Sequence, residues 1–131
     1  NGKLCILGAF DTIWSSKFPN QHAHCTLALR FLFNETDLGK HQFKVVFVNA
    51  DGKELLPNGP LKFGIQIGAI PEKQYFMSRN LTLNMQGLPI PSPGQYSFDI
   101  YWNDNALASI PLQAVQGPNP RSQGRIPPND D

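Results

Sequence analysis

The segment from Pro93 to Leu112 constrains the fold more than any other part of the chain. Pro93-Gly94 is a turn signal, and in the seven residues that follow, Gln95 to Tyr101, large apolar side chains occupy every second position. Such alternation with a period of two is the pattern of a strand with one buried face. A polar hairpin tip, Asn103 to Asn105, leads into a second strand, Ala106 to Leu112. The sequence therefore predicts an antiparallel pair of strands here.

Similar alternation recurs earlier in the chain, over His22 to Phe33, Gln42 to Asn49 and Leu61 to Ile70. Asp51-Gly52 is a hairpin signal, from which we expect the chain to return through residues 53–56. Twelve prolines and eleven glycines favour short strands joined by tight turns over a helical bundle. A tyrosine that enters a late strand from a proline-rich corner is typical of immunoglobulin-like domains. We therefore predict an all-β, immunoglobulin-like antiparallel β-sandwich of seven to eight strands.

The inward positions of these strands define the predicted core. The expected core residues are Leu7, Cys25, Leu27, Leu29, Phe31, Val45, Phe47, Phe63, Ile65, Leu83, Tyr96, Phe98 and Ile100.

The chain of 131 residues suits one domain. We place the sandwich at residues 1–115 and include in it the apolar run Leu4 to Phe10 as a strand buried on both faces. Residues 116–131 are proline-rich, almost without apolar side chains and without periodicity. This composition predicts an extended C-terminal tail, because so few apolar groups do not offset the entropy of ordering.

Charge and hydropathy exclude some partners. The net charge is +1 and only 16% of the residues are charged, with the basic ones scattered, so we expect no nucleic-acid partner. No run of about 18 apolar residues is present, so we expect no membrane span. Cys5 and Cys25 would allow one disulfide. Buried thiols on neighbouring strands are favoured, because a core of this size does not need a disulfide for stability.

Few residues have a pattern that suggests chemistry. His22 and His24 lie on one face of a strand and would form half of a metal site, but further ligands at a matching spacing are absent. Asp11 follows an apolar run and would serve either as a buried general base or, as we favour, to fix a turn. We therefore expect no catalytic residue, no cofactor and no bound metal.

The best candidate for an interaction surface combines a flat strand face with two aromatic side chains. Gly64, Gln66 and Gly68 share one face of a strand, where glycines either permit the close approach of a ligand or mark a bend. We favour the bend. Trp14 and Trp102 would add aromatic contact area to such a surface.

The opening residues Gly2 to Ile13, with Phe18-Pro19, resemble a family of small bacterial proteins of unknown function. Its members share a G-K-L-x-I-L-G-x-F-D-x-I segment, an Asp-Gly hairpin and a P-G-x-Y-x-F strand, here Pro93 to Phe98. A strand of the L-x-S-I-P-L type follows, here Leu107 to Leu112. The resemblance covers roughly residues 2 to 115 and implies a compact β-sandwich without an assigned activity. It also implies a cytoplasmic location, although the sequence leaves open an export signal removed ahead of residue 1.

We expect a non-enzymatic module that binds protein, a second copy of itself included. The alternative is a module that binds a small ligand or carbohydrate through Trp14, Trp102 and neighbouring polar groups. A third reading, a metal-dependent enzyme built on His22 and His24, would require further ligands.

Overall fold

The computed structural model describes residues 9–118, which form seven strands and one short 3-10 helix. The helix, η1 (Glu35–Asp37), begins with a capping box between the side chains and backbone amides of Asn34 and Asp37. The strands are β1 (Thr12–Ser15), β2 (Asn20–Phe33), β3 (Gly39–Asn49), β4 (Leu61–Ile67), β5 (Met77–Ile90), β6 (Gly94–Trp102) and β7 (Asn105–Gln116).

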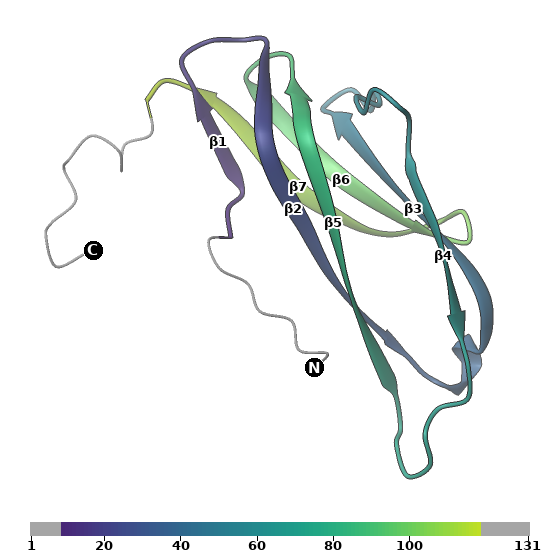
Figure 1. Ribbon diagram of the computed structural model, residues 1–131. Coiled ribbons are helices and arrows are strands. Elements are labelled where there is room, and N and C mark those ends of the chain that lie inside the picture. The colour runs from purple at the N-terminus through teal and green to yellow at the C-terminus, as the bar shows by residue number, and fades with distance from the viewer. Residues whose placement is uncertain (1–8, 119–131) are drawn as a thin grey trace, which may run out of the picture.

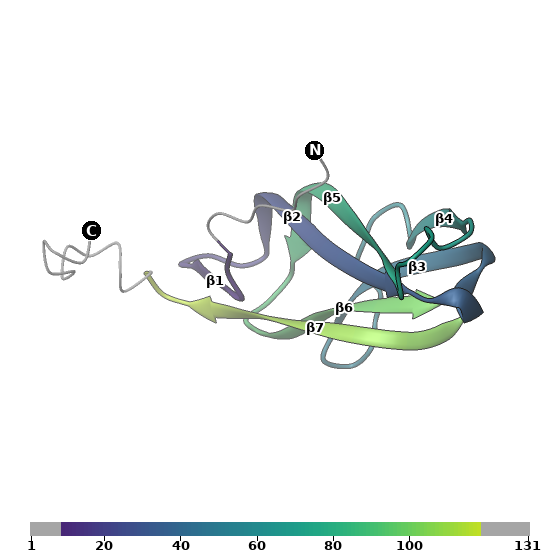
Figure 2. The same cartoon turned by 90° about the horizontal axis from the view of Figure 1, so that it is seen from below.

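The strands form two layers of unequal width. Five strands make one sheet in the order β1-β7-β6-β3-β4, and β2 and β5 alone make the other. Figure 1 shows the pair β2 and β5 lying across the larger sheet, and Figure 2 shows the two layers from the side. The predicted all-β fold of two sheets is therefore confirmed, while the finer immunoglobulin-like label stays a prediction. One pairing departs from the expected antiparallel arrangement, because β1 runs parallel to β7.

The two-stranded sheet follows directly from period-two patterning. On its inner face Leu27 lies opposite Leu83 and Leu29 opposite Leu81. On its outer face the hydroxyl of Thr26 donates to Asn84 Oδ1 at 2.7 Å. Each strand thus presents an apolar face to the interior and a polar face to solvent, which fixes their register, because a slip of one residue would exchange the faces.

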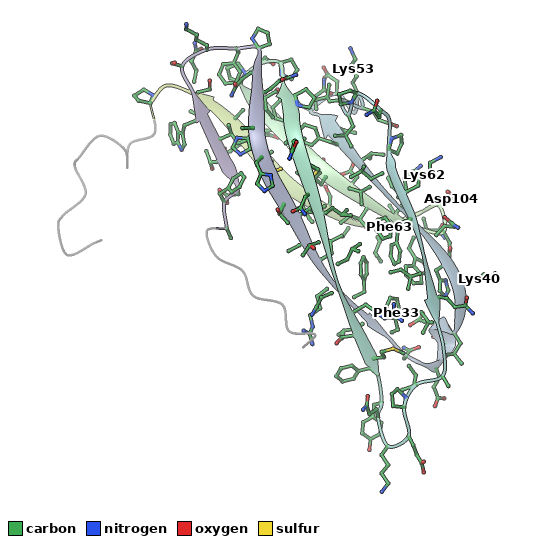
Figure 3. The ribbon with its side chains drawn as sticks, viewed as in Figure 1. Phe33, Lys40, Lys53, Lys62, Phe63 and Asp104 are labelled. Atoms are coloured by element: carbon green, nitrogen blue, oxygen red, sulfur yellow. The ribbon has the colours of Figure 1, made fainter. Side chains whose placement is uncertain are left out.

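The core lies between this pair and the central strands β3 and β6. Val45 and Phe47 of β3 are completely buried, and Phe47 packs against Phe98 with 4.7 Å between the ring centroids. Burial of one such side chain stabilises the fold by about 1.5–3 kcal/mol. Figure 3 shows Phe33 and Phe63 pointing into this interior, whereas Lys62 points away from it.

The predicted core is confirmed over the described residues. Eight of its residues are buried, and four, Phe31, Phe63, Ile65 and Leu83, are partly buried and pack against the others. Leu7 lies outside the described residues. The sequence analysis did not include several residues that the structure also buries, namely Ile13, Phe33, Phe43, Ile67, Met85, Leu88, Ile90, Leu112 and Ala114.

The chain returns after Asp51-Gly52 as expected, but only briefly. The N–H of Asn49 donates to the carbonyl of Lys53 at 3.0 Å, the N–H of Leu55 donates to the carbonyl of Phe47 at 2.8 Å, and Val48 bridges Glu54. No full strand follows until β4 begins at Leu61, and β4 pairs with the earlier part of β3, Gly39 to Val45. Pro57 and Pro60 explain the gap, because proline has no N–H to donate to a ladder.

The proline-rich corner between β5 and β6 comprises residues 91–93. Pro89 belongs to β5 and lies opposite Gln21 of β2. A proline is tolerated there because β5 pairs with β2 alone. The edge of β5 that faces away from β2 has no ladder, so a missing N–H on that edge interrupts no hydrogen bond between strands.

The tyrosine at the start of β6 anchors this corner. The hydroxyl of Tyr96 donates to the carbonyl oxygen of Ser92 and accepts from its N–H at 3.2 Å. The ring is buried and stacks on Phe47, with 5.5 Å between the centroids. The tyrosine therefore links the β5–β6 connection to the core, as the sequence predicts.

Two expected segments lie wholly or mostly outside the described residues. Of the run Leu4 to Phe10, the structure describes Ala9 and Phe10, which precede β1 and belong to no strand. The tail is described as far as Pro118, and Gln116 belongs to β7. Within residues 9–118, no helix is long and apolar enough to cross a membrane.

We expect Tyr96→Phe to lower the free energy of unfolding by about 1 kcal/mol, because it removes the hydroxyl that holds the corner and little else. Urea denaturation followed by circular dichroism measures the change. Tyr101→Phe is the matched control, since the Tyr101 hydroxyl makes no hydrogen bond within residues 9–118, and it should change stability by less than about 0.5 kcal/mol. Equal midpoints for the two variants would contradict the anchoring role.

Candidate functional site

A groove runs along one side of the sandwich, between β2 and β7. It exists because a layer of two strands does not cover a sheet of five, so the interior stays open along the margin of the smaller layer. The groove has a volume of about 430 Å³. Figure 2 shows β2 above β7 along this side of the molecule.

The walls of the groove are mainly apolar. Leu29, Phe31 and Phe33 of β2 form one wall, and Ile110 of β7 and Trp102 of β6 contribute to the other. Two exposed leucines stand at its margin, Leu32 on β2 with 62% of its surface accessible and Leu107 on β7 with 52%. A depression with apolar walls and exposed leucines at its rim is suited to an apolar occupant.

A β-bulge places Leu107 at this position. Ile100 pairs with Ala108 but Tyr101 pairs with Ala106, so Leu107 is an extra residue in β7 without an opposite partner on β6. Bulges bend a strand locally and redirect the side chain of the extra residue. The bulge therefore explains how Leu107 lines the groove.

The backbone of β7 is also open beside the groove. In the described part of the chain, β1 pairs with residues 113–116 of β7, and no strand pairs with the same side of residues 105–112. The N–H of Gln113 points to this side, since it donates to the carbonyl oxygen of Asp11 at 2.9 Å. Because backbone groups alternate in direction along a strand, the N–H and C=O of Ser109 face the same open side.

The charged side chains of the groove are engaged in the fold itself. The guanidinium of Arg30 donates to Ser78 Oγ on β5 at 3.3 Å. The carboxylate of Asp37 accepts from the N–H of Asn34 at 2.8 Å and closes the capping box of η1. The groove therefore offers an occupant apolar surface and backbone groups, while each of its two charged side chains makes a hydrogen bond within the fold.

His41 fixes the end of the groove near η1. Its Nε2 lies 2.6 Å from the carbonyl oxygen of Asp37, and its Nδ1 lies 3.0 Å from Asn103 Nδ2. The amide orientation follows because Asn103 Oδ1 already accepts from the N–H of Gln42 at 2.9 Å. The ring of His41 also stacks on Trp102 at 4.3 Å, so one side chain joins η1, β3 and the β6–β7 hairpin.

The residues predicted as an interaction surface do not form one patch. Trp14 lies on β1, Gly64 and Gln66 lie on β4 at the opposite edge of the five-stranded sheet, and Gly68 follows β4. A Cβ at Gly64 would meet its nearest neighbours at an ordinary 3.6 Å, so this glycine does not mark a close backbone contact. Trp102 alone among the five lines the groove, half-buried against Phe33 and Phe43.

The other candidate residues have structural surroundings. His22 and His24 lie on β2, and no three metal-binding side chains cluster anywhere within residues 9–118. Asp11 is exposed, so it is not a buried general base, and its carboxylate accepts from the hydroxyl of Thr12 at 2.8 Å; its role in fixing a turn stays a prediction. Cys25 is a free thiol on the inner face of β2, and burial raises its pKa, so it stays protonated. Cys5 lies outside the described residues.

Sequence reasoning missed the leucines at the rim and the open edge of β7. Leu32 and Leu107 fall on positions of strands that the alternation assigns to solvent, and an apolar residue at such a position is the signal that was available. No local sequence pattern indicated the open edge of β7. An edge arises where a strand lacks a neighbour, and the sequence of one strand does not show which strands become its neighbours.

We expect Asn103→Gly to lower the free energy of unfolding by about 1–3 kcal/mol, because it removes the amide that bonds Gln42 and His41. Glycine suits the turn itself, since Asn103 has a φ of 47°. The control is Asp104→Gly at the next turn position, where φ is 69° and no side-chain hydrogen bond occurs within the described residues. Equal urea midpoints for the two variants would show that the amide contributes nothing.

Comparison with known proteins adds a family to this geometry. The model of a family of unknown function, DUF6941, matches residues 1–115, which include both strands that border the groove. A search of curated proteins and a search of solved structures each found no match. The expectation of an uncharacterised family is thus confirmed, and the particular shared motifs stay a prediction. Because the match spans most of its length, the chain belongs to the family of unknown function DUF6941.

Proposed function

We propose that this chain is a non-enzymatic, immunoglobulin-like module that binds protein through the groove between β2 and β7. The observation that carries the proposal is the combination of an apolar groove with a strand edge beside it that no other strand of residues 9–118 pairs with. Monomeric soluble proteins rarely leave a large apolar surface open unless something binds there. An unpaired edge is likewise a place where another chain can be added.

The chemistry of the groove favours binding over catalysis. Its walls are apolar, and its two charged side chains, Arg30 and Asp37, are bound to Ser78 and Asn34. A general acid or base needs a titratable group within reach of a substrate proton. The groove supplies shape and apolar surface, which are the means by which interaction modules hold a partner.

We expect Ala108→Trp to abolish partner binding, because an indole at this exposed position on β7 fills the groove from one wall. Ala106→Trp is the matched control, since Ala106 is equally exposed but does not line the groove. Affinity capture from an extract of the source organism, quantified by mass spectrometry, compares the two variants with the unchanged chain. Light scattering after size exclusion tests self-association in parallel.

The expected result is a protein, or the chain itself, that binds the unchanged chain and Ala106→Trp but is at least tenfold depleted with Ala108→Trp. A strictly monomeric chain with the same captured proteins for all three would refute the proposal.

A second candidate function is small-ligand or carbohydrate binding, and Trp102 in the groove wall is the observation that favours it. A ligand in the groove would contact this indole and shift its fluorescence, and Trp14→Phe removes the emission of the other tryptophan. Under this candidate a glycan from a panel shifts the emission of Trp14→Phe but not of Trp102→Phe. Unchanged emission across the panel dismisses it.

A further inference from the structure

We infer that the partner enters the groove as an extended segment that adds one short strand to the open edge of β7, in line with β1, and places apolar side chains in the groove. The inference rests on the proposed function and specifies the chemistry of the partner. It is carried by backbone groups of the described chain, by their direction and by the apolar walls of the groove.

The edge already holds one added strand. β1 is a four-residue segment that pairs with β7 at Gln113 to Gln116, and the bond from Gln113 N–H to the Asp11 carbonyl extends this pairing by one residue. Within residues 9–118 this pairing ends at Gln113, while β7 continues for eight more residues, 105–112. Phe10, which precedes Asp11, has its ring beside His22 of β2 with 5.4 Å between the centroids.

The groups left open on this edge define a short ladder. Residues 109, 111 and 113 have the same orientation, so the open side displays the N–H and C=O of Ser109 and the C=O of Pro111. Pro111 has no N–H, and beyond Ser109 the bulge at Leu107 breaks the register. The edge therefore accepts a segment of a few residues and resists a long, flat strand, which is how natural sheets limit aggregation.

The groove beside this ladder determines the side chains of the occupant. An added strand directs every second side chain toward the inner face of the sheet. Here those side chains would enter the groove, with Leu29 and Phe31 of β2 on one side and Ile110 of β7 on the other. Since the side chains on both sides of this path are apolar, the matching segment has aliphatic or aromatic residues at alternate positions. Main-chain bonds provide affinity and side-chain pockets provide specificity in this mode of recognition.

The test uses a phage-displayed library of eight-residue peptides, selected on the full chain of 131 residues. Ser109→Pro removes the N–H of Ser109, at a position with the same orientation as the natural Pro111. It also removes the hydroxyl that donates to Asp99 at 2.8 Å, and Ser109→Ala is the control because it loses the same hydroxyl but keeps the N–H. We expect selected peptides with apolar residues at alternate positions. Their affinity should fall about tenfold for Ser109→Pro and change less than twofold for Ser109→Ala.

A second measurement leaves the protein unaltered, in case Ser109→Pro does not fold. Methylation of single backbone nitrogens along the best peptide should weaken binding at two positions that are two residues apart, and not at the residue between them. A helical or irregular peptide would not show this period of two, and its absence overturns the inference.

The remaining outcomes separate this inference from the proposed function. Peptides that bind Ser109→Pro normally but are lost with Ala108→Trp would overturn strand addition and leave groove binding in place. Failure to select any peptide sensitive to Ala108→Trp would remove both. Two further outcomes would show that this chain occupies its own groove: displacement of the selected peptides by a synthetic peptide of residues 2–10, or a dimer that Ser109→Pro dissociates. Either outcome would overturn the inference of an external partner.

Discussion

The closing of a five-stranded sheet by a layer of only two strands governs the rest of this structure. β2 and β5 supply long, strictly alternating strands, and their inner faces cover β3 and β6, where Val45 and Phe47 lose all contact with solvent. Two strands do not extend to the margin of the larger sheet. The interior is therefore deep at its centre and open beside β7, and the groove is a consequence of this mismatch in width.

The exposed edge of β7 is restricted along most of its length. β1 covers one end, Pro111 removes a donor, and the bulge at Leu107 interrupts the register near the hairpin. Each of these features limits uncontrolled pairing with another sheet. Within the described residues they leave a few backbone groups accessible at Ser109, next to apolar walls. Open backbone groups beside apolar surface are the physical reason that we place recognition there.

The end of the groove is held by neutral hydrogen bonds in place of charge. His41 bonds the carbonyl of η1 with one ring nitrogen and the amide of Asn103 with the other, while its face stacks on Trp102. The imidazole of His41 thus joins η1 and the start of β3 to the β6–β7 hairpin, about sixty residues later in the sequence. The position of Trp102, a wall of the groove, depends on this junction, so the shape of the groove is tied to the stability of the β6–β7 hairpin.

The sequence by itself determined which residues are extended and which of their faces are buried, because alternation with a period of two can be recognised within the few residues of a single strand. It also located the β6–β7 hairpin and the corner tyrosine, because turn residues and a nearby hydroxyl act within a few residues. It did not determine that β4 pairs with the first part of β3, Gly39 to Val45, or that Pro89 lies in a strand. Nor did it indicate that Trp102 borders a groove while Trp14 and Gly64 lie at opposite edges. Those features were decided by tertiary structure alone, because partners, edges and uncovered margins depend on which strands become neighbours, and no side chain pattern within one strand contains that choice.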